Sequence, residues 1–195
     1  MYSSYASNLV ATSKNSKSAS VTRDALLEAA GRVVVAQGAE ALTLQAVAQE
    51  AGVSKGGLLY HFPNKDALIA GMIQHLVDEF TAALNQELAQ DDAPKTPGHW
   101  VRAYIRASAV FDQQTIALQS GLLAAIAVNP ELLIPIQEIF VDWQRQIEAS
   151  GIDPATATAL RLAIDGLLFA HLFGLGVPKE SLQEAVIETL LKLAH

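Results

Sequence analysis

Residues 54–65 place hydrogen-bond donors of several kinds close together in the sequence. Lys55 and Lys65 carry ammonium groups that suit phosphate oxygens or the acceptor edge of guanine. Tyr60 and His61 add donors that suit phosphate. Side chains of these types in one short segment predict a surface that contacts the backbone and the base edges of a nucleic acid.

Two adjacent glycines, Gly56 and Gly57, lie in the middle of these donors. In a helix interior each glycine is less favourable than alanine by on the order of 1 kcal/mol. A helix with a bare face would, however, let a phosphate backbone or a base edge approach closely. The alternative is that the pair is simply a turn between two ordinary helices, and the spacing alone leaves both interpretations open.

Two short helices are expected to position these residues. Thr43 can cap the first helix, Gly52 ends it, and Ser54 can cap the second, which ends at residues 60–62. Two short helices joined through a glycine form a helix-turn-helix, in which the second helix enters the major groove of DNA. The sequence therefore predicts a helix-turn-helix over residues 43–62.

The rest of the chain has the periodicity of helices, and the alternating patterns of strands are nearly absent. Thr22 and Asn64 are further cap candidates, and the glycines and prolines mark the helix ends. We expect an all-α fold of about nine helices, three of them within the first 62 residues. Besides the two short helices, the expected ranges are 22–37, 65–90, 99–111, 115–128, from residue 130 to 150, 154–173 and 179–194.

The amino-acid composition indicates the compartment and the class of the protein. Of its 195 residues 51% are hydrophobic and 17% charged, a surplus of apolar residues that a subunit interface or an internal pocket would absorb. The absence of cysteine excludes a disulfide framework and fits a reducing cytoplasm. Residues 1–20 are rich in serine and resemble neither a signal peptide nor a membrane span. We expect a cytoplasmic protein without a membrane partner.

The net charge of −7 is unevenly distributed along the chain. Residues 1–70 carry six basic and five acidic side chains, whereas residues 71–195 carry seven basic and fifteen acidic ones. Phosphate would repel the acidic part, so only the N-terminal part is expected to approach DNA. Lys14 and Lys17 could reach a minor groove from the N-terminal tail, but a solvated linker is the alternative.

Residues 22–73 resemble the N-terminal domain of TetR-family transcriptional regulators. The resemblance runs without gaps through the segments 23–30, 42–44, 47–48, 51–56, 60–62 and 64–68, with Gly38 between the first two. It implies that Thr43 and Gln45 contact phosphate and the edge of the groove. The positions that it assigns to DNA binding are Thr43, Gln45, Ser54, Lys55, Gly56, Gly57, Tyr60, His61 and Lys65.

Two positions depart from the family pattern. Leu59 stands where many members have a tyrosine that contacts phosphate, so that contact is not carried over. Gly57 offers no side chain where others have Thr, Ala or Asn, which leaves base specificity to Lys55 and Gln45.

The C-terminal part, by the same resemblance, binds a small molecule and dimerises. Its last two helices are apolar on much of their circumference and suit a four-helix interface with a symmetry mate. A ligand cavity is expected among the middle helices, for a hydrophobic or amphipathic molecule that remains unidentified. The alternative is that the aromatic residues are core and that Arg161 and Asp165 form an ordinary surface pair. The candidates for the cavity are Trp100, Tyr104, Phe111, Gln119, Trp143, Arg161, Asp165 and Phe169, together with His171.

Signals for catalysis or metal binding are missing from the sequence. The five histidines have no metal-ligand spacing, and acidic pairs such as Asp91-Asp92 are interpreted as solvated charges. The glycines at 174 and 176 do not follow a strand, so they form no dinucleotide fingerprint. We expect no catalytic residue, no metal and no cofactor, and hence a protein that is not an enzyme.

These observations predict a tail over residues 1–20 that is disordered, a helix-turn-helix domain over 21–66 and a ligand-binding and dimerisation domain over 67–195. The expected function is a homodimeric transcriptional repressor that a small molecule releases from a pseudo-palindromic DNA operator. Ligand binding would act by shifting the helix over 65–90. The alternative is an all-helical small-molecule-binding or interaction protein without specific DNA binding.

Overall fold

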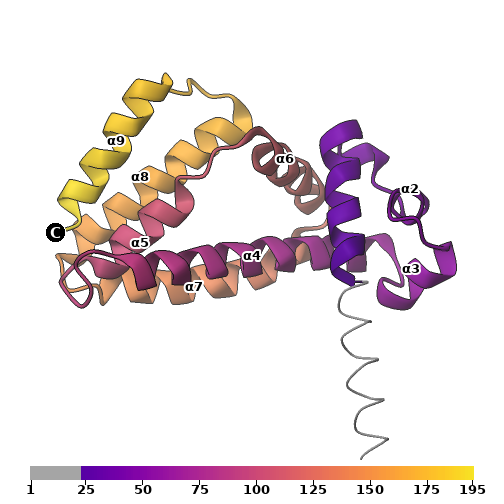
Figure 1. Ribbon diagram of the computed structural model, residues 1–195, viewed down its shortest axis with the longest axis horizontal. Helices are drawn as coiled ribbons and strands as arrows, with labels where there is room; N and C mark the ends of the chain where they lie inside the picture. The colour runs from indigo at the N-terminus through magenta and orange to yellow at the C-terminus, as the bar shows by residue number, and fades with distance from the viewer. Residues whose placement is uncertain (1–22) are drawn as a thin grey trace, which may run out of the picture. The chain divides into compact units, whose positions relative to one another are not determined.

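The structure, a computed structural model, describes residues 23–195, and every regular element in that range is helical (Figure 1). The predicted all-α fold is therefore confirmed, with a helix over residues 23–37 followed by α2 to α9. The chain divides into two compact units between Met72 and Ile73. The predicted cap Thr22 and the tail that holds Lys14 and Lys17 lie outside the described residues.

The N-terminal unit contains the helix over residues 23–37, the 3-10 turn η1 (Ala39–Ala41), α2 (Leu44–Glu50), α3 (Lys55–His61) and the start of α4 (Lys65–Gln90). Gly38 ends the first helix with a φ of 84°, a backbone conformation that glycine adopts most easily. Gly52, with a φ of 67°, makes the turn between α2 and α3. Both glycines therefore have the roles that the sequence predicted.

Side-chain caps begin the three helices that follow, as the sequence predicted. Thr43 Oγ1 accepts a hydrogen bond from the Ala46 N–H at 3.1 Å, at the start of α2. Ser54 Oγ accepts from the Gly57 N–H at 3.1 Å and begins α3. At the start of α4, Asn64 Oδ1 accepts from the Ala67 N–H at 2.8 Å. Each cap satisfies a backbone donor that the helix itself cannot pair.

The core of the N-terminal unit forms where these short helices cross. Ala48 is buried and small, which allows α2 to lie close to α3, and Leu58 on α3 is fully buried. An ion pair of 2.6 Å between Arg32 Nε and Glu50 Oε1 joins the first helix to α2. The remaining buried side chains include Leu26, Ala29, Ala30, Val33, Val34, Leu42, Val47, Phe62, Leu68 and Ile69. This core leaves the opposite side of α3 facing outward.

The C-terminal unit contains the rest of α4 and five further α-helices. They are α5 (His99–Ser108), α6 (Gln113–Val128), α7 (Ile134–Glu148), α8 (Pro154–Phe173) and α9 (Glu180–Leu193). Helix α8 is central, because it packs against α5, α6, α7 and α9 (Figure 1). The core of this unit gathers around α5 and α8, with Tyr104, Ile105 and Ile164 among its most deeply buried side chains.

Most helix bounds follow the sequence, and the larger differences lie in α5, α6 and α7, the last of which ends at Glu148 rather than at Ser150. Helix α5 ends at Ser108 rather than at Phe111. Helix α6 begins two residues early because the Asp112 carboxylate accepts from the backbone N–H groups of Gln114 and Thr115, both at 3.0 Å. The break at residues 129–130 leads first into a 3-10 turn, η2 (Pro130–Leu133), and only then into α7.

By length and composition alone, α4 and α8 are apolar enough to cross a membrane. A core helix of a water-soluble protein passes the same test, and α8 packs against four other helices. Only 17% of the most apolar window of α8 is buried in this single chain, however. Much of its apolar surface is therefore left without a neighbour in the C-terminal unit.

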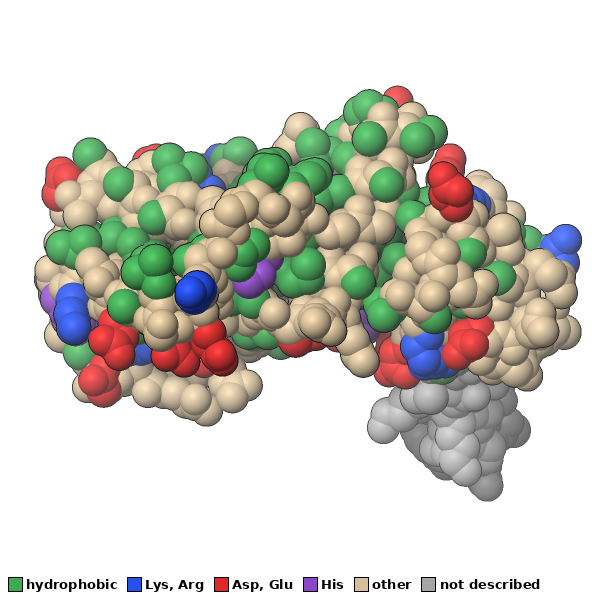
Figure 2. All heavy atoms as spheres, turned by 90° about the horizontal axis from the view of Figure 1, so that it is seen from above, with side chains coloured by type: hydrophobic (Ala, Val, Ile, Leu, Met, Phe, Trp, Pro, Cys, Tyr) green, Lys and Arg blue, Asp and Glu red, His purple; other side chains and the backbone are tan. Residues whose placement is uncertain are grey.

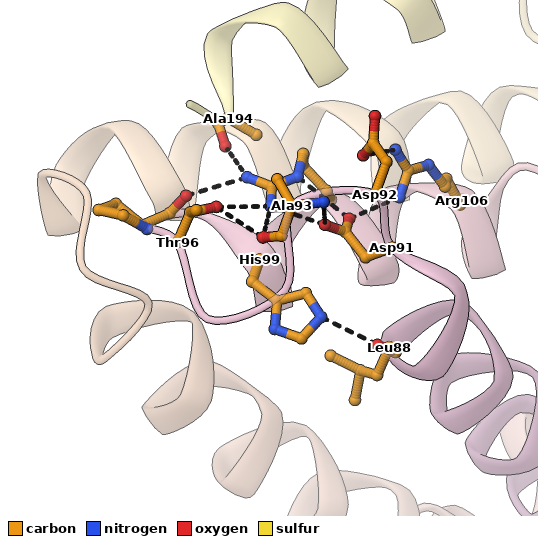
Figure 3. Close-up of polar contacts among 10 residues, drawn as sticks. Leu88, Asp91, Asp92, Ala93, Thr96, His99, Arg106 and Ala194 are labelled. Carbon is orange, nitrogen blue, oxygen red and sulfur yellow. Dashed lines mark hydrogen bonds and ion pairs between the residues drawn. The ribbon is translucent and has the colours of Figure 1, made fainter.

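A buried ionic cluster joins the loop after α4 to α5 and to the end of α9 (Figure 3). Arg102 is completely buried, and its guanidinium donates to both carboxylate oxygens of Asp91, at 2.9 and 3.1 Å, and to the Ala194 carbonyl at 2.9 Å. Arg106 donates to Asp91 Oδ2 at 2.7 Å. Hydrogen bonds from Arg102, and then from the Ala93 N–H and Arg106, hold the pKa of Asp91 well below its usual range against the effect of burial. The prediction that Asp91 is a solvated charge is wrong, because these donors replace water.

The same cluster explains why position 98 is a glycine. Gly98 has a φ of 77°, and a Cβ added there would lie 1.9 Å from the Ala194 carbonyl oxygen. The carbonyl that accepts from Arg102 therefore occupies the space of a side chain at position 98. The loop before α5 and the end of α9 approach each other too closely for any residue other than glycine.

Candidate DNA-binding surface and ligand cavity

The residues that the sequence assigned to DNA binding lie at the start of α2, in α3 with its cap, and at the start of α4. Tyr60 is 80% exposed, and His61 is half-buried with its ring edge-on to that of Tyr60 at 5.0 Å between centroids. Leu58, on the opposite side of the same helix, is fully buried. The other assigned residues, all exposed, are Thr43, Gln45, Ser54, Lys55, Gly56, Gly57 and Lys65.

Gly56 and Gly57 both lie inside α3, and neither has a positive φ. The alternative interpretation, that they form a turn between two helices, is therefore wrong. A Cβ added at Gly56 would meet only Ser54 Oγ, at 3.9 Å, and one at Gly57 would lie 3.4 Å from the same atom. Those are ordinary contact distances, so the fold itself does not require glycine at either position. The lack of side chains at these two positions therefore favours a binding partner that comes close to the backbone of α3.

Lys55 and Lys65 keep their charges available. Among residues 23–195, no carboxylate lies within ion-pairing distance of either ammonium group. Leu59 is 37% exposed, so the position at which the sequence departs from the family pattern presents an apolar side chain to the solvent. The exposed side of α3 and the start of α4 therefore combine two cations, a phenol and a bare backbone, a combination that suits phosphate and base edges.

A cavity of about 220 Å³ lies within the C-terminal unit. Four of the eight residues predicted for a pocket line it, namely Tyr104, Gln119, Trp143 and Asp165. The other lining residues are Ile73, Leu76, Val77, Phe80, Ser108, Leu122, Leu123, Ile126, Phe140, Leu168 and Leu172. The wall is thus built from α4, α5, α6, α7 and α8, and most of it is apolar.

The structure places the other predicted residues outside the wall. Trp100 stacks on Tyr104, with 5.6 Å between ring centroids, and Arg161 pairs with Asp165, so both contact residues of the wall without lining the cavity. Phe111 stacks on His171 at 4.5 Å, away from the cavity. Phe169 is 55% exposed on α8. The sequence analysis did not identify Phe80 and Phe140, whose apolar spacing does not distinguish a cavity wall from a core.

One polar network faces the cavity from α5 and α8. Tyr104 Oη donates to Asp165 Oδ1 at 2.9 Å, and Arg161 Nη1 donates to Asp165 Oδ2 at 2.8 Å. Burial raises the pKa of Asp165, while the hydrogen bond from Tyr104 and the charge of Arg161 oppose that rise. Burial, followed by the charge of Asp165, raises the pKa of the Tyr104 hydroxyl. The side chains of Arg161 and Asp165 are only 15% and 26% exposed, so the interpretation as an ordinary surface pair is wrong.

Gln119 faces the same cavity from α6. Its side-chain oxygen is buried and has no hydrogen-bond partner in the part of the chain that the structure describes. Most buried polar groups are paired, so an unpaired one lining a cavity needs an explanation.

Helices α8 and α9 of the C-terminal unit expose large apolar side chains. Figure 2 looks onto the side of this unit where the two helices lie, and hydrophobic side chains cover much of it. On α8, Leu162, Phe169 and Phe173 are each at least 51% exposed, and on α9 Leu182 and Leu193 are at least 56% exposed. Large exposed apolar side chains gathered on one side of a unit are typical of a protein–protein interface.

Two family models match the chain. The N-terminal one, "Bacterial regulatory proteins, tetR family", covers residues 26–72, and "Tetracyclin repressor-like, C-terminal domain" covers residues 98–195. The HTH-type transcriptional regulator BetI of Brucella suis is 28% identical over 182 residues, which are 88% of this chain and 90% of that protein. RutR of Escherichia coli K12, also an HTH-type transcriptional regulator, is 28% identical over 155 residues, 73% of this chain and 71% of that protein.

Solved structures agree with the family models. A transcriptional regulator from Rhodococcus sp. Rha1 has a TM-score of 0.67 at 24% identity, covering 88% of this chain and 95% of that one. The multidrug binding protein EbrR, complexed with ethidium, has a TM-score of 0.63 at 25% identity, covering 88% and 97%. The model matches span the helix-turn-helix and the domain that holds the cavity, and the chain therefore belongs to the TetR family of bacterial regulatory proteins, as a DNA-binding transcriptional regulator.

Proposed function

We propose that the chain is a homodimeric repressor that leaves a pseudo-palindromic operator when a small molecule fills the cavity of its C-terminal unit. The single observation that supports DNA binding is the exposed side of α3, where Gly56 and Gly57 leave the backbone accessible although the fold has room for side chains. The ligand-binding half is supported by the cavity and its unpaired Gln119 oxygen. EbrR, whose fold is similar, binds compounds such as ethidium in a solved structure.

The DNA contacts follow from the exposed residues of α2, α3 and the start of α4. Lys55 and Gln45 read base edges, and Gly56 with Gly57 lets the helix approach the groove floor. Lys65 and Tyr60 bind phosphate, which sets the register of the protein on the duplex. Thr43, Ser54 and His61 contribute further donors beside them.

Helix α4 offers a route from the cavity to the recognition helix. It is one continuous helix from Lys65, four residues after the end of α3, to Gln90. The same helix carries Ile73, Val77 and Phe80, which line the cavity. A ligand that prefers one position of these side chains shifts the population of α4 positions toward it. Two half-sites demand a fixed distance between recognition helices, so a small shift is enough to weaken binding.

The exposed apolar faces of α8 and α9 form the homodimer interface in this proposal. Pairing them with a second copy buries Phe169, Phe173 and Leu182 and gives two recognition helices for two half-sites. Gel filtration at micromolar concentration is expected to give the mass of a dimer. A stable monomer under those conditions contradicts the two-half-site proposal.

The test of the DNA-binding surface is a selection on random duplex DNA, followed by measurement of the selected operator with variants of α3. Lys55→Ala and Tyr60→Ala are each expected to weaken specific binding, because they remove a base contact and a phosphate contact. Lys179→Ala removes an exposed lysine of the C-terminal unit and serves as the matched control, with binding unchanged. If both α3 variants bind the operator normally, α3 is not the recognition helix.

The proposal includes neither catalysis nor a membrane. Tyr104 and Asp165 are hydrogen-bonded to each other, and the Gln119 oxygen has no partner among the described residues. None of these three groups is a nucleophile activated by a base. A repressor works in the compartment that holds the DNA, which in a bacterium is the cytoplasm. No observation favours the alternative of a helical interaction protein without specific DNA binding.

A further inference from the structure

The walls of the cavity limit the size and polarity of what it can hold. Its volume of about 220 Å³ lies below the roughly 300–1,000 Å³ of sites for drug-sized ligands. Phe80, Tyr104 and Phe140 surround Trp143, with ring centroids 4.7 to 6.0 Å from that of the tryptophan. Aliphatic side chains from α4, α6 and α8 complete the wall. The occupant is therefore compact and mostly apolar.

The donors that point at Asp165 are already in use, and the unpaired Nε of Arg161 belongs to a residue outside the cavity wall. The Tyr104 hydroxyl gives its hydrogen to one oxygen of Asp165, and Arg161 donates to the other. A carboxylate has about four acceptor positions, so Asp165 can accept further hydrogen bonds. The buried oxygen of Gln119 accepts none among the described residues. The wall thus holds unused acceptor positions on Gln119 and Asp165, which a hydrogen-bond donor on the ligand would satisfy.

The charges around the cavity favour a neutral molecule. Asp165 is the one carboxylate of the wall, and the guanidinium of Arg161 already balances it. A cationic ligand would enter an apolar cavity without a carboxylate of its own, and an anionic one would meet no cation in the wall. An unbalanced charge is costly in surroundings of low polarity.

We infer that the cavity selects a compact, neutral, largely apolar molecule that presents one N–H or O–H donor to the Gln119 side-chain oxygen. This inference rests on the proposed function, because it specifies the ligand to which the repressor would respond. It assigns Gln119 as the residue that distinguishes a ligand with a donor from one of the same shape without it.

The test compares three probes on the full-length protein by isothermal titration calorimetry. Indole is compact and neutral and has one N–H donor, and 1-methylindole has the same rings without the donor. Tryptamine adds a positive charge. Indole is expected to bind up to about tenfold more tightly than 1-methylindole, the usual effect of one hydrogen bond, and more tightly than tryptamine.

A variant of Gln119 separates the hydrogen bond from the packing. Gln119→Leu keeps the size of the side chain and removes the acceptor, so the preference for indole over 1-methylindole should fall while 1-methylindole binds at least as tightly as before. Gln137→Leu, at an exposed position on α7, is the matched control and should keep the full preference. Retained binding of 1-methylindole shows that the cavity of the Gln119 variant is still folded.

Three results overturn the inference: equal affinities of indole and 1-methylindole, tighter binding of tryptamine than of indole, or no binding of indole at millimolar concentration. Release of the selected operator is measured separately with the same probes. If indole binds with the expected preference and does not release the operator, the ligand assignment stands and the proposed ligand control fails. If the operator is released only by molecules without a donor, the proposed ligand control stands and the ligand assignment fails.

Discussion

The two units of this regulator use their polar groups in opposite ways. In the N-terminal unit the polar groups of α3 point outward, and Lys55 and Lys65 have no carboxylate partner in the described chain. In the C-terminal unit Asp91, Arg102 and Asp165 point inward and are paired by neighbouring side chains of the same unit. The first arrangement leaves hydrogen-bonding capacity for a large partner, and the second uses it to hold helices together.

Glycine shows the same contrast. At Gly56 and Gly57 the fold has room for a side chain, whereas at Gly98 the backbone of α9 occupies that room. A glycine required by a partner and a glycine required by the fold are indistinguishable in the sequence. Only the surroundings of the missing Cβ separate them. The following predictions test this contrast, from the largest expected effect to the smallest.

Removing Arg102 is expected to have the largest effect on stability. Arg102→Met leaves the buried Asp91 carboxylate and the Ala194 carbonyl without their main donor, and breaking a buried pair in this way is worth about 3–5 kcal/mol of unfolding free energy. Chemical denaturation measures it. Arg145→Met, which breaks an ion pair that is about 70% exposed, is the control and should change stability by roughly 1 kcal/mol or less. Similar effects of the two variants would contradict the role of the cluster.

Acid is expected to remove part of the same stabilisation. Because the folded-state pKa of Asp91 is depressed, its contribution is fully present above the unfolded pKa of about 4 and is lost as the pH falls toward the folded value. The raised pKa of Asp165 acts in the opposite direction, since its protonation favours the folded state.

Unfolding free energies measured from neutral pH into the acid range check the sign. The wild-type protein should lose stability more steeply than Asp91→Asn as the pH falls. Asp142→Asn, in an exposed ion pair, is expected to follow the wild-type curve. A parallel course of the wild-type and Asp91→Asn curves would show that Asp91 is not the group that titrates.

Lysine substitutions should separate base contacts from phosphate contacts. Lys55→Ala is expected to weaken operator binding by about 1–3 kcal/mol and to relax specificity at one base pair. Lys65→Ala should weaken all sequences about equally and reduce the salt slope of binding by about 1. Titrations of operator and unrelated DNA at several salt concentrations distinguish the two. Equal losses on both DNAs for Lys55→Ala would make it a phosphate contact.

Gly57→Ala is expected to change stability and binding in opposite directions. Alanine should stabilise α3 by up to about 1 kcal/mol, because the added methyl group meets only ordinary contacts. Operator binding should weaken, because the same methyl group stands between the helix and the DNA. Gly98→Ala is the contrasting variant, and it should destabilise the protein through both its positive φ and its contact with Ala194. Unchanged operator affinity of Gly57→Ala would remove the argument for close approach.

The sequence by itself determined the elements of the helix-turn-helix and most helix ends. The caps Thr43, Ser54 and Asn64 act on backbone groups within three residues, and Gly38 and Gly52 relieve strain at their own positions. Such interactions are local, so residue type and spacing contain the information. The bounds of α4 and the start of α8 at Pro154 followed for the same reason.

Only the tertiary structure decided which inward side chains meet. Helical periodicity shows that a face is apolar, but it does not say whether that face meets a core, a cavity or a second subunit. Trp100 and Tyr104 lie on one helix, yet only the tyrosine reaches the cavity wall, and Phe140 joins it from α7. The sequence suggests a loop charge at Asp91, but in the structure Asp91 accepts from the buried Arg102, which also donates to Ala194, 92 residues further along the chain. Contacts between distant segments depend on how helices pack, and no short stretch of sequence contains that information.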